Sequence, residues 1–182
     1  MAPSGQPTSS ALQALRDGKA AGSWTLDPSR SEVRLKTRHT WGLRPLNGVF
    51  RQVTGSGTVS PSGDVTGTVT VAAQSIDTKN SQRDKHLRSA DFFDVANHPD
   101  ITFTAERVRS SGDGVAVDGQ LTVRGRTLPV SLDAAVSSFD DGEVRLDGEL
   151  RVNRADFGLT WNFIGIAAMD NVVIVHAVFT RQ

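Results

Sequence analysis

Residues 65–71 read Val65-Thr66-Gly67-Thr68-Val69-Thr70-Val71, with threonine at every second position. Successive side chains of a β-strand point to opposite faces, so this period of two predicts a strand with one buried and one solvent-exposed face. The turn-forming residues Pro61-Ser62-Gly63-Asp64 stand immediately before it. We therefore expect an antiparallel strand that a tight hairpin joins to the preceding one.

Similar strand patterns recur along most of the chain. The alternation begins near Glu32, where Val33 and Leu35 alternate with basic residues, and further strands are expected in the ranges 49–59, 101–109, 115–123, 128–136, 144–152 and 172–180. Short turns that contain Gly or Asp separate several of these ranges. The pattern predicts an all-β fold of about eight antiparallel strands in meander order. Because tight hairpins build an up-and-down sheet whose edges must be closed, a barrel is favoured over a sandwich.

Two segments interrupt the strands. Residues 82–90 form a predicted surface helix, with Ser81 as its cap and Leu87 as an apolar anchor. The residues Asp91-Phe92-Phe93-Asp94 that follow indicate a turn whose rings plug an opening and whose carboxylates cap backbone amides. The second segment, residues 157–169, is a long apolar and aromatic loop, and loops of this kind are uncommon unless they have a function.

Residues 1–22 form a polar N-terminal extension. A short helix is predicted within it, capped by Ser10 and ended by Gly18. The extension has neither the basic start nor the apolar run of a signal peptide, and no stretch of the chain approaches the roughly 20 apolar residues of a membrane-spanning helix. We therefore expect a cytoplasmic protein in which a single domain, residues 23–182, follows the extension.

Composition excludes several classes of function. The 182 residues include 20 Lys and Arg against 20 Asp and Glu, so no overall field attracts a polyanion and no nucleic-acid partner is expected. The absence of cysteine excludes disulfides, thiolate catalysis and Cys-based zinc sites. A basic row on one strand, Arg34, Lys36 and Arg38, is interpreted as a solvated outer face rather than a phosphate site.

The sequence contains no familiar catalytic motif. Its densest set of candidate acid, base or metal-binding groups is Asp84, His86, Asp91 and Asp94. We interpret these groups as turn caps and surface ion pairs, and expect no metal, no cofactor and no catalytic residue. An enzyme that uses Asp84 and His86 as acid and base is the weakest alternative.

The apolar positions of the predicted strands are filled mainly by Val, Leu, Ile and Ala, and aromatic residues make up only 6% of the chain. The interior of an eight-stranded barrel is either filled by side chains or just wide enough for one small or slender ligand. The residues alone leave both possibilities open.

The stretch from Ser75 to Val95, followed by His98-Pro99 and Ile101-Thr102-Phe103, closely resembles the signature of the YceI-like family. Residues 24–31 are similar to the family's opening strand, and Arg154-Ala155-Asp156-Phe157-Gly158 is similar to a late family element in which serine stands at the second position. The resemblance covers about residues 23–182, which is nearly everything outside the N-terminal helix.

The resemblance implies a lipocalin-like, eight-stranded antiparallel barrel, and the residue pattern adds two short helices, one near the N-terminus and one at about 82–90. It also implies a non-catalytic protein that binds and carries a long apolar chain, namely a polyisoprenoid, an isoprenoid quinone or a fatty-acid-like amphiphile. A homodimer is expected on the same ground, and transient contact with a membrane is expected as part of the cytoplasmic location. Many members are periplasmic, but here a polar extension stands in place of a signal peptide.

On this hypothesis the ligand tail lies against inward-facing residues of the barrel, and a further set of apolar residues surrounds its mouth. The proposed cavity residues are Val33, Leu35, Phe50, Ile76, Leu87, Phe92, Phe93, Ile101, Phe103, Trp161, Phe163 and Ile164. The candidate ligands of a polar headgroup are Arg83, His86 and Arg88. The alternative is a protein-interaction module with a solidly packed barrel, which uses the loop 157–169 as its interface.

Overall fold

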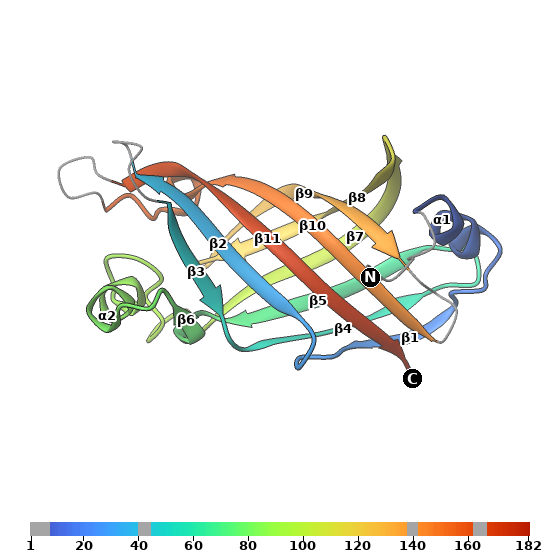
Figure 1. Cartoon of the computed structure of the whole chain (residues 1–182), viewed down its shortest axis with the longest axis horizontal. Coiled ribbons are helices and arrows are strands. Elements are labelled where there is room, and N and C mark those ends of the chain that lie inside the picture. The colour runs from blue at the N-terminus through green and yellow to red at the C-terminus, as the bar shows by residue number, and fades with distance from the viewer. Residues whose placement is uncertain (1–7, 40–44, 138–141, 162–166) are drawn as a thin grey trace, which may run out of the picture.

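The computed structural model describes residues 8–39, 45–137, 142–161 and 167–182 (Figure 1). One antiparallel sheet of eleven strands dominates the fold. Its strands are β1 (Gly22–Leu26), β2 (Glu32–His39), β3 (Leu46–Phe50), β4 (Val53–Val59), β5 (Val65–Ala72), β6 (Ile76–Asp77), β7 (Asp100–Ser111), β8 (Gly114–Val123), β9 (Arg126–Ser137), β10 (Glu143–Asn153) and β11 (Ala167–Arg181). Two α-helices, α1 (Thr8–Arg16) and α2 (Ser81–Arg88), and two 3-10 helices, η1 (Ala73–Ser75) and η2 (Arg154–Phe157), complete the described part.

The sheet closes on itself through β1. On one edge of β1, Trp24 is paired with Gly57 of β4, and on the other edge it is paired with Arg181 of β11. The ring β1, β4, β5, β7, β8, β9, β10, β11 is therefore a closed antiparallel barrel of eight strands, as the sequence predicts. At the end of the barrel near α2, β2, β3 and β6 continue the sheet from β11.

Two predicted strand boundaries are wrong. Residues 49–59 are divided into β3 and β4, because the amide of Arg51 donates to the carbonyl of Ser75 and the amide of Gln52 donates to the Ser75 hydroxyl. These bonds bend the chain between the two strands. The last strand begins at Ala167 rather than near residue 172, because it stays paired with β10 as far as Asp170 and is paired at Ala167 with His39 of β2.

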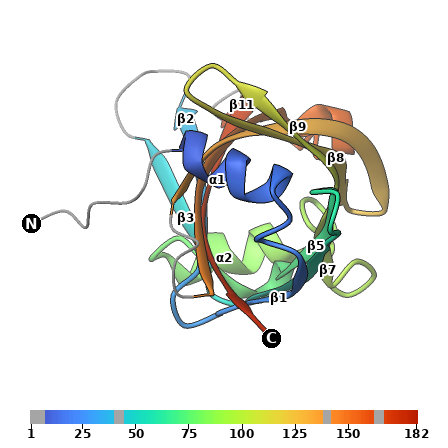
Figure 2. The same cartoon turned by 90° about the vertical axis from the view of Figure 1, so that its right-hand side faces the viewer.

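The helices stand at opposite ends of the barrel (Figure 1), and the end-on view places α1 across one opening (Figure 2). Helix α1 begins at Thr8, so Ser10 lies inside the helix and not before it, while Gly18 has the left-handed φ of +69° that suits a residue just beyond a helix C-terminus. The cap of α2 is Asn80 and not Ser81, since its side chain accepts a bond from the amide of Arg83. Helix α2 also ends at Arg88, two residues before the predicted end.

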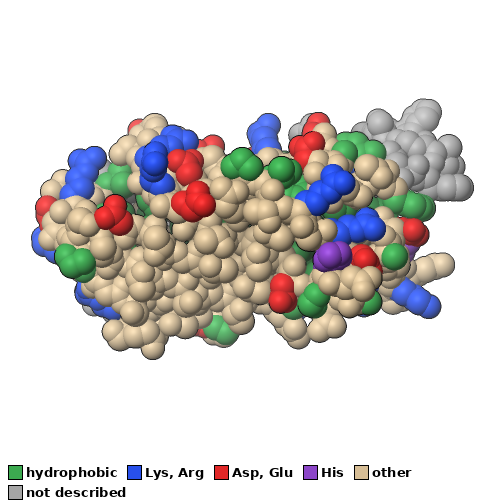
Figure 3. Space-filling model, turned by 180° about the vertical axis from the view of Figure 1, so that it is seen from behind, with side chains coloured by type: hydrophobic (Ala, Val, Ile, Leu, Met, Phe, Trp, Pro, Cys, Tyr) green, Lys and Arg blue, Asp and Glu red, His purple; other side chains and the backbone are tan. Residues whose placement is uncertain are grey.

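Apolar side chains point mainly into the barrel. Val53, Val71, Val115 and Leu132 are all buried, and together with other inward residues they form one continuous core cluster. From behind, the outer wall carries few hydrophobic side chains and has a broad area with neither positive nor negative charge (Figure 3). No α-helix within the described ranges is long and apolar enough to cross a membrane.

Candidate ligand-binding cavity

A cavity of about 860 Å³ runs through the interior of the barrel. Its volume lies toward the upper end of the range of roughly 300–1,000 Å³ that is usual for small-molecule sites. Every strand except β6 contributes to its wall, and most of the lining residues are Val, Leu, Ile and Phe. The interior of the barrel is therefore not packed solid.

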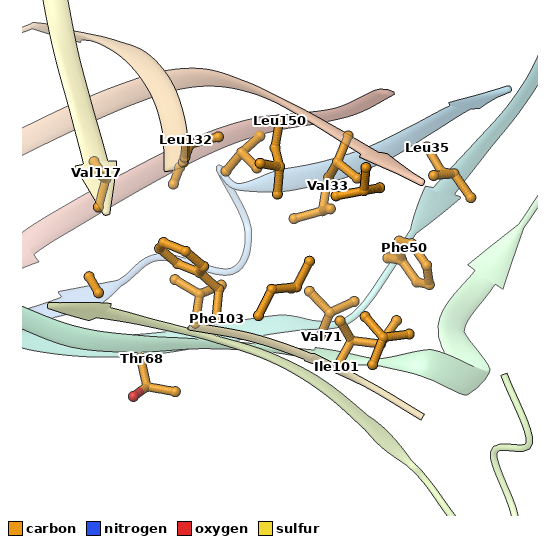
Figure 4. A pocket seen from close by; sticks show the side chains of 18 of the residues that line it. Val33, Leu35, Phe50, Thr68, Val71, Ile101, Phe103, Val117, Leu132 and Leu150 are labelled. Atoms are coloured by element: carbon orange, nitrogen blue, oxygen red, sulfur yellow. The ribbon is translucent and has the colours of Figure 1, made fainter. Parts of the chain in front are cut away.

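The alternation of each strand determines which side chains reach the cavity. In Figure 4 Val33, Val71, Phe103 and Leu150 point toward the space enclosed by the sheet, whereas Thr68 points away from it. Thr68 belongs to β5, whose Val65, Val69 and Val71 line the cavity; Thr68 borders it too, although its side chain points outward. The period of two read from the sequence of this strand therefore corresponds to an apolar inner face and a polar outer face.

Most of the predicted cavity residues line this space. Val33, Leu35, Phe50, Ile101 and Phe103 lie on its strand wall, and Leu87, Phe92, Phe93 and Trp161 lie toward the end covered by α2. Phe163 and Ile164 fall outside the described residues.

Ile76 differs from its prediction. It is not among the residues that line the cavity, and its side chain is fully buried at 0% exposure. Ile76 lies in β6 opposite Phe50, and its Cδ1 atom lies 2.8 Å from where a Cβ on Gly48 would stand. Ile76 therefore fills the core beside the cavity, in the space next to Gly48 that it shares with the Thr78 methyl group.

Three rings meet at the α2 end of the cavity. The imidazole of His86 lies 4.3 Å from the Trp161 ring and 5.3 Å from the Phe92 ring, edge to face in both cases. Phe92 and Trp161 are themselves 5.4 Å apart. Phe92 is buried, whereas Trp161 is 39% exposed, so the cluster extends from the cavity to the solvent. We call His86, Phe92 and Trp161 the mouth cluster.

The predicted role of the Asp-Phe-Phe-Asp turn is only partly seen. Both rings line the cavity, and Phe93 also packs edge to face on Phe50 at 5.8 Å. The carboxylates bond to side chains instead of capping backbone amides. Asp91 lies 3.1 Å from His86 Nε2, and both oxygens of Asp94 accept from the side-chain Nδ2 of Asn97.

The three candidate headgroup residues have different surroundings. Arg83 lines the cavity and donates from Nε to the Thr78 hydroxyl at 2.8 Å and from Nη2 to the Thr78 carbonyl at 2.7 Å. His86 lines the cavity as part of the mouth cluster. Arg88 is not a lining residue, because its guanidinium donates to the carbonyls of Gln74 and Ile76 and so fastens α2 to the segment before it.

Arg154 is a cavity residue that the sequence prediction missed. It is only 9% exposed, and its Nη1 donates to the carbonyls of Leu159 and Trp161, each at 2.8 Å. Its Nε donates to the carbonyl of Ala168 at 3.1 Å, and its guanidinium lies 5.6 Å from the Phe92 ring centroid. Burial lowers the pKa of this guanidinium from its usual value, but arginine stays charged. The sequence signal that could have identified Arg154 as a cavity residue is its position in the late family-like element, between a strand and an apolar loop.

Buried polar side chains also line the cavity toward the mouth cluster. Thr37 and Asn171 are paired across β2 and β11, and both are buried in the cavity wall, as is Thr78. The period of two that places Val33 and Leu35 inside also places Thr37 inside, so this residue was predictable. The buried polar side chains of the cavity wall are therefore gathered at the α2 end.

The residues of the weakest alternative, an acid–base enzyme, do not form a pair. Asp84 is buried and accepts bonds from the amide and hydroxyl of Thr78, at 2.9 and 2.6 Å, while His86 pairs with Asp91. In the described ranges no group of three or more His, Cys, Asp or Glu side chains is placed to hold a metal ion.

Comparisons with known proteins agree with this architecture. A model of the YceI-like domain matches residues 24–179. Over 128 residues the chain is 39% identical to a UPF0312 protein of Pectobacterium atrosepticum; the match covers 68% of this chain and 66% of that protein, just under two thirds of its length. Over 158 residues it is 34% identical to protein YceI of Salmonella arizonae, covering 82% of this chain and 81% of that protein.

A solved structure shows the same architecture. A polyisoprenoid binding domain from Saccharophagus degradans, implicated in plant cell wall breakdown, superposes with a TM-score of 0.70 over 87% of this chain and 98% of that one. The two sequences are 15% identical, so this likeness concerns the fold alone.

Proposed function

This chain belongs to the YceI-like domain family, and from that premise we propose that its barrel binds and carries a long-chain apolar ligand without catalysing a reaction. The barrel fold of this family supports apolar ligand binding in general. The proposed ligand class is a polyisoprenoid, an isoprenoid quinone or a fatty-acid-like amphiphile. Residues 23–182 are the proposed carrier domain, and residues 1–22 are an extension that contains α1.

The cavity is the observation that carries this proposal. Its volume of about 860 Å³ is enclosed mainly by aliphatic and phenylalanine side chains, which offer no strong hydrogen bonds to a polar solute. Transfer of a methylene group from water to such a site is worth about 0.8 kcal/mol, so a long chain gains enough to offset the cost of ordering it.

The polar region sets the proposed orientation of the ligand. Arg83 and His86 line the cavity at the end near α2, where buried Thr78 and Arg154 also lie. A headgroup at this end would keep polar neighbours, while the tail would extend between the strands toward α1. An amphiphile fits this division better than a pure hydrocarbon. Its headgroup would find polar partners at the α2 end, and without such partners a polar group is costly to bury.

The protein-interaction alternative is less well supported. It requires a solid barrel and an exposed loop, whereas the barrel has a cavity and Phe157 and Leu159 are each only 4% exposed. These two residues pack in the core instead of offering an interface. In the same loop Trp161 is 39% exposed, and residues 162–166 lie outside the described ranges.

A pair of substitutions on β5 tests the proposal. Val69 faces the cavity and Thr68 faces outward, so Val69→Trp fills the space whereas Thr68→Trp adds the same ring outside it. Each full-length variant would be titrated with a fluorescent fatty acid and a fluorescent isoprenoid alcohol. We expect saturable binding by the wild type and by Thr68→Trp, with a loss of at least about tenfold in affinity for Val69→Trp. Equal binding by both variants, or none by the wild type, would overturn the proposal.

The homodimer, the transient membrane contact and the cytoplasmic location expected from the sequence are further parts of this proposal. Sedimentation equilibrium of the full chain tests the first, and flotation with lipid vesicles in the presence and absence of ligand tests the second. Cell fractionation tests the third.

A further inference from the structure

Helix α1 lies across the end of the barrel that is opposite α2 (Figure 2). The C-terminal turn of α1 packs on the hairpin between β4 and β5 so closely that a Cβ on Gly63 would stand 2.7 Å from the carbonyl oxygen of Leu15. A Cβ on Gly18 would likewise stand 2.9 Å from the carbonyl oxygen of Pro61. Both glycines have positive φ, so backbone meets backbone at this contact. The helix also contacts β8 and β9 on the other side of the opening.

The segment between α1 and β1 is fastened to the barrel as well. Trp24 donates from Nε1 to the carbonyl of Ala20 at 3.0 Å, and Ala20 is only 1% exposed. Arg181, near the end of β11, lies 5.7 Å from the Trp24 ring and donates to the carbonyls of Lys19 and Ala21. These contacts hold α1 in a fixed position relative to the closing pair of strands.

The apolar residues of α1 have different roles. Ala11 is buried and Leu12 packs against the core cluster. Leu15, one turn further along, lines the cavity itself. It lies beyond the domain match of residues 24–179, so the family match assigns it no role.

We propose that Leu15 is the end stop of the cavity and sets the longest chain that the protein holds. This inference rests on the proposed function, because it requires a ligand whose head stays at the α2 end. The inward residues of β5 from Val65 to Val71 span about 20 Å at roughly 3.3 Å per residue, which gives the scale of the space that the tail must fill. Each methylene that fits improves the dissociation constant about fourfold, and a chain that reaches Leu15 gains nothing from a further one.

The test compares Leu15→Ala and Leu15→Phe with the wild type as full-length proteins. A series of saturated fatty acids of increasing chain length would compete for each protein, with bound species read by native mass spectrometry. Leu15→Ala removes about three carbon atoms from the wall, so the longest tightly bound chain should become longer by a similar number. Leu15→Phe should make it shorter.

Leu12→Ala is the matched control, because it removes the same atoms from the same helix at a position that packs on the core. It should lower thermal stability without moving the length limit. A limit that stays constant across the Leu15 variants, while all of them bind, would overturn the end-stop inference alone. A wild-type protein that binds no member of the series or of an isoprenoid alcohol series would overturn the proposed function, and the inference with it. If the longest tightly bound chain also changed in Leu12→Ala, the length limit would depend on the whole helix, which would contradict the role of Leu15.

Discussion

The imidazole of His86 and the indole of Trp161 meet edge to face at the α2 end of the cavity, with ring centroids 4.3 Å apart. Phe92 contacts both rings from the buried side, and Arg154 lies 5.6 Å from the Phe92 ring centroid. Trp161 is the most exposed member of this group. A ligand that uses this end of the barrel would have to pass the mouth cluster.

Replacing Trp161 by alanine should therefore accelerate both uptake and release of ligand several-fold, with a smaller change in affinity. The ring lies at the α2 end, on the path that a ligand would take in either direction, so its loss should lower the barrier to uptake and to release. Stopped-flow exchange of a fluorescent fatty acid measures both rates. Trp161→Phe keeps an aromatic ring and should stay near the wild type. Unchanged rates in Trp161→Ala would show that ligands pass elsewhere.

Arg154→Met should lower the free energy of unfolding by about 3 kcal/mol or more, because carbonyls that now accept from the guanidinium would lose a buried donor. Equilibrium unfolding in urea measures the change. Arg151→Met is the control, since Arg151 is 85% exposed and its ion pair with Glu149 is 3.5 Å long; a change within about 0.5 kcal/mol is expected there. Equal effects of the two substitutions would contradict the structural role given to Arg154.

Two isoleucines offer a matched pair inside the barrel. Ile76→Ala should cost about 3 kcal/mol of stability, because its side chain is fully enclosed, and should leave ligand affinity nearly unchanged. Ile101→Ala should cost less stability and weaken binding, since Ile101 already faces the cavity. Urea unfolding and ligand titration of both variants separate the two effects. If Ile76→Ala weakened binding more than Ile101→Ala and cost less stability, Ile76 would be part of the ligand-binding wall after all.

Asp27 provides a dependence of stability on pH. Hydrogen bonds from the Ser29 side chain and from Arg30 lower the pKa of this carboxyl from 3.8 to about 2. Because the pKa is lower in the folded state, Asp27 stabilises the fold above pH 3.8, and that contribution is lost as the pH falls toward 2. Asp27→Asn should flatten the fall in stability across this window, and Ser29→Ala should flatten it in part. Thermal unfolding at a series of pH values measures this. If Asp27 made no such contribution, stability would fall as steeply with pH in Asp27→Asn as in the wild type.

The sequence predicts the barrel because its determinants are local. The alternation in residues 65–71 specifies β5 and its inner face, and the two-residue turn Arg124-Gly125 specifies the hairpin between β8 and β9. The bend between β3 and β4 was not predictable in this way. It depends on Ser75, which is distant in sequence and takes the hydrogen bonds of Arg51 and Gln52.

The candidate site is predictable to the same extent. Phe103 and Val33 follow from strand alternation, whereas Ile76 and Arg88 do not, because their positions depend on how β6 and α2 pack against the barrel. Leu15 reaches the cavity only because α1 folds across the opening, which no local pattern encodes. The predicted homodimer and cytoplasmic location stay predictions.

The most direct test of a ligand in the barrel is mass spectrometry of an organic extract of the full-length protein purified under native conditions. The wild type, Thr68→Trp and Val69→Trp would be carried through the same steps. A stoichiometric isoprenoid, quinone or fatty amphiphile is expected from the wild type and from Thr68→Trp, and a strongly reduced amount from Val69→Trp. No such molecule in the wild type, even after incubation with membrane lipids, would contradict the proposal that this barrel carries a long-chain apolar ligand.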